Sequence, residues 1–376
     1  TRGQLTINET QFDNGWFRST AQINIAYAAL DLGDELSMLV EFDIVHGPFI
    51  LTEDGPKLGL AHATIKPSFN SAEITSALTQ IPFELPSLSF DLFAAFDQSL
   101  AVTVEVAPVS YDDSRAQVSF AGMTGSLQAN PDLSSEVLLS VGTLQAEDRD
   151  SQFGFNLAGL ELQSSSSQMN DILAPSSGRL TIPALSTTGP VEINVRDILI
   201  DSQIQASSIT GALDISQDIR VASIESDFPI ASFSWTSEVN QLQSQIIRSY
   251  YELISNLQAQ ITANPGTTID QSSFMDEQLG MIVLQNSLVF NNLIQTNAYG
   301  GDHSIDLKIN WAGLPDTNAA ADLDIAEAIN AMTINLEVAL DERAVMSSQF
   351  AELVDPYVQQ GYLRVENGSI LLNGTL

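Results

Sequence analysis

Histidine has the side-chain pKa closest to neutral, so histidines are the first candidates for acid–base catalysis or metal binding. This chain of 376 residues has three of them, His46, His62 and His303. None has a second ligand at a spacing that would place both on one helix or strand. We interpret His46, Gly47 and Pro48 as a structural corner, because glycine frees the backbone and proline fixes φ and removes a donor. A ligand or catalytic role for His46 is the less favoured alternative.

Calcium-binding loops are the next chemistry to consider in so acidic a chain. The segment 147–152 resembles the start of such a loop at Asp148. Phe153 stands where the loop needs a glycine, and Gly159 stands where it needs a bidentate carboxylate. We therefore interpret the segment as a solvated turn and expect no metal site.

Paired carboxylates can share the roles of general acid and general base. Asp112-Asp113 and Asp322-x-Asp324 are such pairs. In a chain with 47 acidic residues, close pairs also arise by chance, so a solvated face is the better interpretation. A hydrolase that uses two carboxylates is thus the least favoured function.

Other catalytic signatures are missing. The sequence has no G-x-S-x-G, no glycine-rich phosphate loop ending in Gly-Lys and no H-E-x-x-H. It also has no cysteine, which excludes disulfides, thiol catalysis and thiolate metal sites. We expect a protein that is not an enzyme and needs no cofactor.

The charge restricts the partners. The 47 acidic and 13 basic residues give a net charge of -34. This field repels nucleic acid and anionic membrane surfaces, so we expect no nucleic-acid partner. Only three of the basic residues are lysines, which favours a marine or halophilic source.

The elements that must position these residues are mostly strands. Apolar and polar residues alternate with period two in the first 235 residues, for example in Leu36 to Ile44 and in Val102 to Val106. Asn14-Gly15 and Asp54-Gly55-Pro56 supply turns. We expect residues 1–125 to form an N-terminal antiparallel β region.

Residues 126–235 contain a faint repeat with a period of about 40 residues. Its pattern is apolar-x-apolar-x-x-apolar, and it occurs at Leu139 to Leu144, Leu180 to Leu185 and Ile219 to Ile224. A second strand of the unit, at Phe155 to Leu162 and at Ile193 to Ile200, follows the first two occurrences. We predict an apolar binding face formed by Leu157, Leu160, Leu162, Val195, Ile198 and Ile200.

The pattern changes in residues 236–376, where we expect an α+β region. Apolar residues at steps of three and four predict helices over 236–262 and 272–295. Strands return at 305–311 and 332–340, and a third helix is predicted over 341–360 before a hairpin around Asn367-Gly368. The expected fold is therefore α+β and mostly β: an elongated, curled antiparallel sheet of repeated strand units, with two or three helices in the C-terminal third. The three regions are expected to form one continuous elongated unit.

Several short motifs resemble one known family. They are Gly15-Trp16-Phe17-Arg18-Ser19-Thr20-Ala21 with the strand into His46-Gly47-Pro48, then Tyr299-Gly300-Gly301, and then Gly361-Tyr362-Leu363 with the closing hairpin 368–374. Together they resemble the YdgA-like family of bacterial envelope proteins. The resemblance implies a protein of Gram-negative bacteria with no established activity, whose periplasmic β-rich region is tethered to the inner membrane by an N-terminal segment. No such segment opens this sequence, so either it was removed or this member is released to the outer envelope or the exterior.

The function expected from these observations is noncatalytic. A periplasmic protein with one apolar sheet face is suited to binding lipid or another amphiphile along that face. The alternative is a structural or self-assembling envelope protein that binds a protein partner or a second copy. Contact with the membrane is expected only through the N-terminal anchor that this chain lacks. The sequence alone does not separate an open groove from a face covered by a helix.

Overall fold

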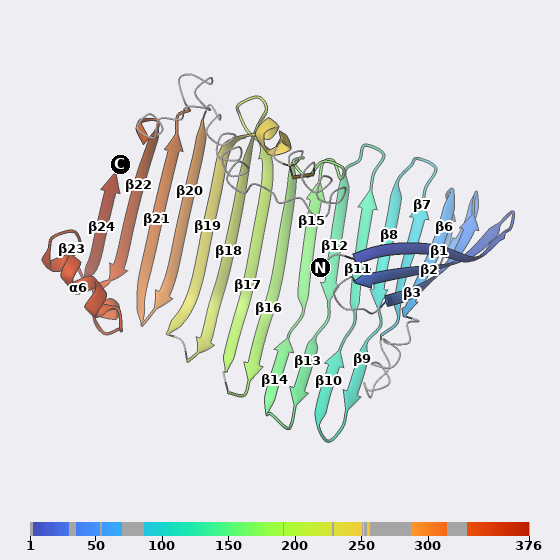
Figure 1. The fold of residues 1–376 in the computed structure, drawn as a ribbon, viewed down its shortest axis with the longest axis horizontal. Helices are drawn as coiled ribbons and strands as arrows, with labels where there is room; N and C mark the ends of the chain where they lie inside the picture. The colour runs from blue at the N-terminus through green and yellow to red at the C-terminus, as the bar shows by residue number, and fades with distance from the viewer. Residues whose placement is uncertain are drawn as a thin grey trace. The chain divides into compact units, whose positions relative to one another are not determined.

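The computed structural model describes most of the chain, in two compact units. The described residues are 3–29, 35–52, 55–69, 86–190, 192–227, 229–249, 251, 254–255, 287–313 and 329–375. Unit 1 comprises residues 1–172 and 178–196, and unit 2 comprises residues 173–177 and 197–376. Both units are built mainly of antiparallel strands (Figure 1). The prediction of a mostly β α+β fold is confirmed, whereas the division at residues 125 and 235 stays a prediction.

Unit 1 begins with long strands and continues with short ones. Its strands are β1 (Gly3–Asn14), β2 (Arg18–Ala29), β3 (Glu35–His46), β4 (Phe49–Thr52), β5 (Gly55–Leu58), β6 (Ala61–Phe69), β7 (Leu88–Ala94), β8 (Leu100–Val106), β9 (Val109–Asp112), β10 (Ala116–Phe120), β11 (Met123–Ala129), β12 (Ser135–Val141), β13 (Leu144–Asp148), β14 (Phe153–Leu157), β15 (Leu160–Ser166) and β16 (Ser176–Thr188). Antiparallel pairing runs β1–β2–β3–β6–β7–β8–β11–β12–β15 in one series. A second series runs β9–β10–β13–β14–β16, and β4 and β5 form a hairpin of their own.

The two series meet along a line of breaks that we call the crease. It consists of the residue pairs 107–108, 121–122, 142–143 and 158–159, and the registers on both sides place these pairs opposite one another. Hydrogen bonds join neighbouring strands along this line, from Gly142 N to Gly122 O and from Ala121 N to Thr143 O, both at 2.8 Å. Where the chain passes the crease, from β8 to β9, from β10 to β11, from β12 to β13 and from β14 to β15, it therefore has one residue more than strict alternation of side chains allows. This extra residue produces the x-x spacing in two of the repeat motifs, 139–144 and 155–162.

Unit 2 contains long strands and two described helices near its C-terminal end. Its elements are β17 (Ile193–Ala206), which begins in unit 1, β18 (Ala212–Ser226), β19 (Ile230–Gln243), β20 (Leu288–Ala298), β21 (Gly301–Trp311), β22 (Met332–Asp341), α5 (Glu342–Met346), α6 (Ala351–Gln359), β23 (Arg364–Glu366) and β24 (Ser369–Thr375). Antiparallel pairing runs β18–β19–β20–β21–β22–β24–β23. The predicted strands at 305–311 and 332–340 and the closing hairpin are confirmed. The single helix predicted over 341–360 is instead two helices, α5 and α6, because the chain turns at residues 347–350.

The helix predicted over 236–262 is wrong in its first part. Residues 236–243 belong to β19, and a described helix occupies only 244–249 before the description becomes discontinuous. The step of three from Val239 to Leu242 comes from a bulge, where Gln241 has φ 65° and the β18–β19 register shifts. The extra residue of a bulge thus gave a strand the spacing of apolar residues that is typical of a helix.

The helix predicted over 272–295 is also wrong from Leu288 onward, because 288–298 is strand β20. This strand has apolar residues on both sides, such as Leu288 and Val289, and lacks the alternation that identifies a half-buried strand. Residues 272–286 lie outside the described part of the chain.

Most inward-facing apolar side chains of the described strands are half-buried. The buried hydrophobic residues include Val40, Ala63, Leu213 and Val345, and Ile50 and Ile370 are fully enclosed. Within the described ranges, no helix has the length and hydrophobicity that a membrane span needs.

Candidate functional site

His46 is the last residue of β3, and its ring joins three segments of unit 1. Its Nε2 lies 2.8 Å from the Ser19 hydroxyl, which in turn donates to Asn14 Oδ1 at 3.2 Å. The Ser19 hydroxyl therefore links the His46 ring to the Asn14 side chain. Ser19 is buried, with 4% of its surface exposed. This geometry fastens the turn between β1 and β2 to the end of β3.

Gly47 brings the corner close to a neighbouring chain segment. Its N–H donates to Leu60 O at 2.8 Å, and Gly59 N donates to Pro48 O at 3.2 Å. A Cβ at position 47 would lie 1.7 Å from the Gly59 carbonyl oxygen, so only glycine fits. The backbone turns here from β3 into the β4–β5 hairpin.

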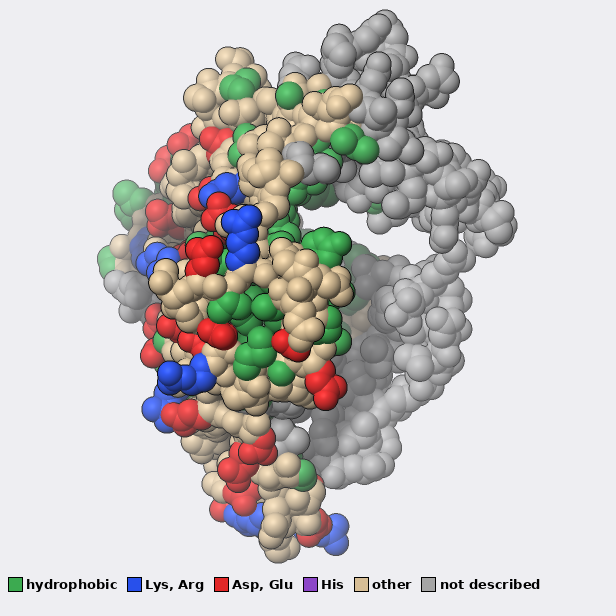
Figure 2. All heavy atoms as spheres, turned by 90° about the vertical axis from the view of Figure 1, so that its left-hand side faces the viewer, with side chains coloured by type: hydrophobic (Ala, Val, Ile, Leu, Met, Phe, Trp, Pro, Cys, Tyr) green, Lys and Arg blue, Asp and Glu red, His purple; other side chains and the backbone are tan. Residues whose placement is uncertain are grey.

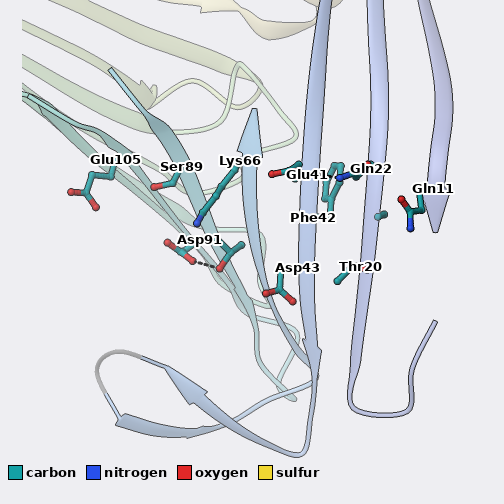
Figure 3. A pocket seen from close by; sticks show the side chains of 12 residues that line it. Gln11, Thr20, Gln22, Glu41, Phe42, Asp43, Lys66, Ser89, Asp91 and Glu105 are labelled. Atoms are coloured by element: carbon teal, nitrogen blue, oxygen red, sulfur yellow. Dashed lines mark hydrogen bonds between the residues drawn. The ribbon is translucent and has the colours of Figure 1, made fainter. Parts of the chain in front are cut away.

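Polar side chains line a hollow of about 700 Å³ on one face of β1, β2, β3, β6, β7 and β8, which we call the polar hollow (Figure 3). It contains the carboxylates Glu41, Asp43, Asp91 and Glu105 together with Lys66. Alternation explains this face, because the opposite face of the same strands carries the apolar residues.

Neighbouring donors hold three of these carboxylates. The Arg18 guanidinium forms a bidentate pair with Asp43, with Nε 2.6 Å from Oδ1. Asp91 Oδ1 accepts from the Thr64 hydroxyl at 2.7 Å and lies 3.5 Å from His62 Nε2. Gln22 donates to Glu41 at 3.0 Å. The hydrogen bond from Arg18 lowers the pKa of Asp43, the opposite of what a general acid needs.

The other acidic candidates stabilise turns. Asp148 Oδ1 accepts from Asp150 N at 3.0 Å, and its Oδ2 accepts from the Ser151 hydroxyl at 2.7 Å. Asp112 pairs with Arg149 at 2.7 Å, while Asp113 accepts from two backbone N–H groups at 2.7 Å. Asp322-x-Asp324 lies outside the described residues. In the described part of the chain, no three His, Asp or Glu side chains are grouped to hold a metal ion.

In unit 2 an apolar pocket of about 370 Å³ lies between β20–β22 and the helices α5 and α6. The local sequence explains this arrangement. Tyr299 and Gly300 have φ of 53° and 77° and form a two-residue turn between β20 and β21. Asp341 caps α5 by accepting from Ala344 N at 2.8 Å. A Cβ on Gly301 would lie within 2.6 Å of Ala344 Cβ, so this glycine lets α5 approach the sheet.

Apolar side chains form most of the pocket wall. They are Ile294, Ala298, Tyr299, Ile305, Leu340, Val345, Phe350, Leu353 and Val354. Tyr299 and Phe350 meet edge to face, with their ring centres 6.0 Å apart. The pocket thus has an aromatic wall at its helical side.

Three of the polar residues in the wall, Thr296, His303 and Ser348, direct their hydrogen bonds to backbone atoms, and Ser304 is a further polar residue of the wall. His303 Nε2–H donates to Ala298 O at 2.9 Å, and its Nδ1 accepts from Asp341 N at 3.3 Å. The Ser348 hydroxyl donates to Val345 O at 2.7 Å, and the Thr296 hydroxyl donates to Ser232 O at 2.8 Å. Because these groups are satisfied within the protein, they do not penalise an apolar ligand in the pocket.

The residues predicted as an apolar binding face occupy two sets of strands. Leu157, Leu160 and Leu162 lie on β14 and β15, on either side of the crease, and are half-buried. Val195, Ile198 and Ile200 lie on β17 and are also half-buried, and Asp197 between them has φ 53°. Neither set lines the apolar pocket.

The residues of the apolar pocket were not predicted from the sequence. Two signals for it were present: the Tyr299-Gly300-Gly301 turn, and a helix after Asp341 that carries Phe350 and Leu353. The sequence does not show that the turn and the helix lie on the same face of the sheet. The pairing of β21, which follows the turn, with β22, which precedes the helix, brings them together.

Comparison with known proteins gives one match. The family model described as "Bacterial protein of unknown function (DUF945)" matches residues 1–375. No curated protein and no solved structure matches the chain.

Proposed function

This chain belongs to the bacterial family of unknown function DUF945, and we propose that it is a noncatalytic envelope protein that binds the apolar part of a lipid or other amphiphile. The resemblance to the YdgA-like family is confirmed by this membership. The proposed binding site is the apolar pocket of unit 2. The apolar face at Leu157 and Val195 stays a prediction from the sequence.

The observation that carries the proposal is a pocket whose wall is mostly apolar and in which three of the polar side chains are already paired with backbone atoms. Its volume of about 370 Å³ lies within the usual range of ligand pockets. Since Thr296, His303 and Ser348 bond to backbone atoms, a polar ligand would find few free partners there. A hydrocarbon chain loses no hydrogen bonds on entering and removes apolar surface from water.

Native mass spectrometry of the purified chain tests this proposal. Co-purifying lipid, or uptake of a dansyl-labelled fatty acid, is the expected result. A clean apo mass together with no uptake of the labelled fatty acid would contradict it.

A matched pair of variants localises the binding. Phe350 in the pocket and Phe153 on β14 are 45% and 46% exposed, so their replacement by alanine should affect folding similarly. Phe350→Ala removes half of the aromatic wall and should weaken binding of the labelled fatty acid by about tenfold. Phe153→Ala should leave it unchanged. Equal losses in both variants would place binding elsewhere.

The proposed location is the periplasm, with the full-length protein tethered to the inner membrane. The resemblance to envelope proteins supports this proposal. In spheroplasts of a Gram-negative bacterium that makes the full-length protein, added protease should digest it. Protection until the inner membrane is broken would contradict a periplasmic location.

A second candidate is a structural or self-assembling envelope protein. The exposed surface around α6 favours it: Leu353 is 65% exposed, and Tyr357 and Tyr362 next to it are also exposed. Figure 2 shows hydrophobic side chains gathered on the side where α6, β23 and β24 lie, among acidic residues. Light scattering during size exclusion tests this candidate, because a strict monomer at high protein concentration would contradict it.

A further inference from the structure

One end of unit 1 exposes a group of large apolar side chains, which we call the aromatic tip. It consists of Trp16, Phe17, Phe49, Leu51, Leu58 and Phe96, whose exposed fractions range from 55% to 94%. These residues lie on the β1–β2 turn, the β4–β5 hairpin and the β7–β8 turn. Their degree of exposure is unusual for aromatic and aliphatic side chains, which are normally buried.

Backbone hydrogen bonds connect these segments into one row. His46 N donates to Phe17 O at 2.8 Å, and Gly47 N donates to Leu60 O at 2.8 Å. Leu60 N then donates to Ala94 O at 2.8 Å, next to the β7–β8 turn. The β1–β2 turn and the β4–β5 hairpin lie at the same end of the strands that carry Thr20 and Asp43 (Figure 3). The exposed side chains are thus presented together by a hydrogen-bonded edge.

The tip has a smaller net negative charge for its length than the whole chain, because basic residues are more frequent there. Its segments, residues 14–18, 47–60 and 94–99, contain two basic residues, Arg18 and Lys57, and three acidic residues, Glu53, Asp54 and Asp97. The whole chain has 13 basic and 47 acidic residues. The tip segments therefore have a net charge of only -1, and an uncharged or zwitterionic surface does not repel them.

We propose that the aromatic tip docks unit 1 onto the surface of a zwitterionic phospholipid bilayer. Aromatic side chains on adjacent turns can enter the headgroup region together, where Trp is favoured. A second copy of the chain is the weaker alternative, because each copy has a net charge of -34 and the two would repel each other. A neutral bilayer imposes no such repulsion.

This docking surface does not depend on the pocket in unit 2. A lipid-binding protein gains from contact with a membrane, but the tip and the pocket lie in different units and can be tested separately. Loss of vesicle binding with intact uptake of the labelled fatty acid would overturn only the docking proposal.

Vesicles of brominated phosphatidylcholine provide the direct test. Trp16 is 94% exposed, so insertion of the tip should shift its fluorescence to shorter wavelength and expose it to quenching by the lipid bromines. The chain has three tryptophans, and Trp16→Phe should remove the quenched component. Binding should persist in high salt, because burial of apolar surface drives it. Quenching that survives Trp16→Phe would overturn the proposal.

A matched pair of double variants gives the second readout. Phe49→Ser with Leu51→Ser removes two tip side chains and should lower the vesicle partition coefficient at least about tenfold. Phe153→Ser with Leu138→Ser removes the same residue types at exposed positions on β14 and β12 and should change it little. Equal binding by both double variants would overturn the proposal. So would vesicle-free dimerisation that only the tip variant abolishes, since that result identifies a second copy as the partner.

Discussion

Replacing Gly47 by alanine should destabilise unit 1 at the corner between β3 and β4. The new Cβ would lie 1.7 Å from the Gly59 carbonyl oxygen and 2.9 Å from its carbon, and both atoms belong to the backbone. The two segments must separate, which strains or breaks the hydrogen bonds Gly47 N to Leu60 O and Gly59 N to Pro48 O. Two backbone bonds and an overpacked contact together cost about 3 kcal/mol.

Hydrogen exchange measured by mass spectrometry reports this loss locally. A cost of about 3 kcal/mol should speed exchange in peptides that span residues 44–62 by about a hundredfold. Gly374→Ala is the control, because a Cβ there has no neighbour within 4 Å, and its effect should stay within about 0.5 kcal/mol. If Gly47→Ala exchanged as slowly as this control, the close approach at the corner would be incorrect.

Three further predictions follow from other contacts. Ser19→Ala removes the hydrogen-bond partner of His46 Nε2 at a buried position and should lower the free energy of unfolding by about 1–3 kcal/mol, measured in urea. The hydrogen bond to Asp113 raises the pKa of Tyr111 to about 12, so absorbance titration should show one tyrosine that ionises late and reverts in Asp113→Ala. Asp197→Val should destabilise β17 by about 1–2 kcal/mol, because φ 53° is unfavourable for a β-branched residue.

Each of these predictions has its own check. Ser140→Ala, at an exposed position on β12, should change the urea midpoint little. An equal loss in this variant would mean that the effect of Ser19→Ala does not come from its contact with His46. The Tyr111 pKa is raised in the folded state, so its contribution to stability is present below about pH 10 and is lost as the pH rises through about 12. Asp197→Gly should be tolerated, since glycine adopts positive φ freely; a loss equal to that of Asp197→Val would point to the carboxylate instead.

The strands of unit 1 were predictable because one side of each faces water. Val102, Val104 and Val106 alternate with exposed residues, and this alternation identifies a strand without further context. The turn at Asn367-Gly368 was equally clear, because both residues adopt the positive φ that a two-residue hairpin turn needs.

The errors arose where tertiary structure changed the period. The bulge at Gln241 made Val239 and Leu242 look like successive turns of a helix, although both lie on β19. Strand β20 has apolar residues on both of its faces, so alternation was lost there. The apolar pocket depends on which strands lie next to α5, and the aromatic tip depends on three turns meeting at one sheet end. Neither arrangement is encoded in a local pattern.

The crease places a restriction on how this sheet can change in evolution. The chain passes the crease four times, and each time the alternation of its side chains shifts by one residue at the same row. The lengths of the strands on either side of the crease therefore depend on one another. Inserting or deleting one residue in a single strand would turn half of its side chains to the wrong face relative to its neighbours. Whole hairpins can be added or removed without this penalty. Variation in the length of such proteins should therefore occur in steps of complete strand pairs.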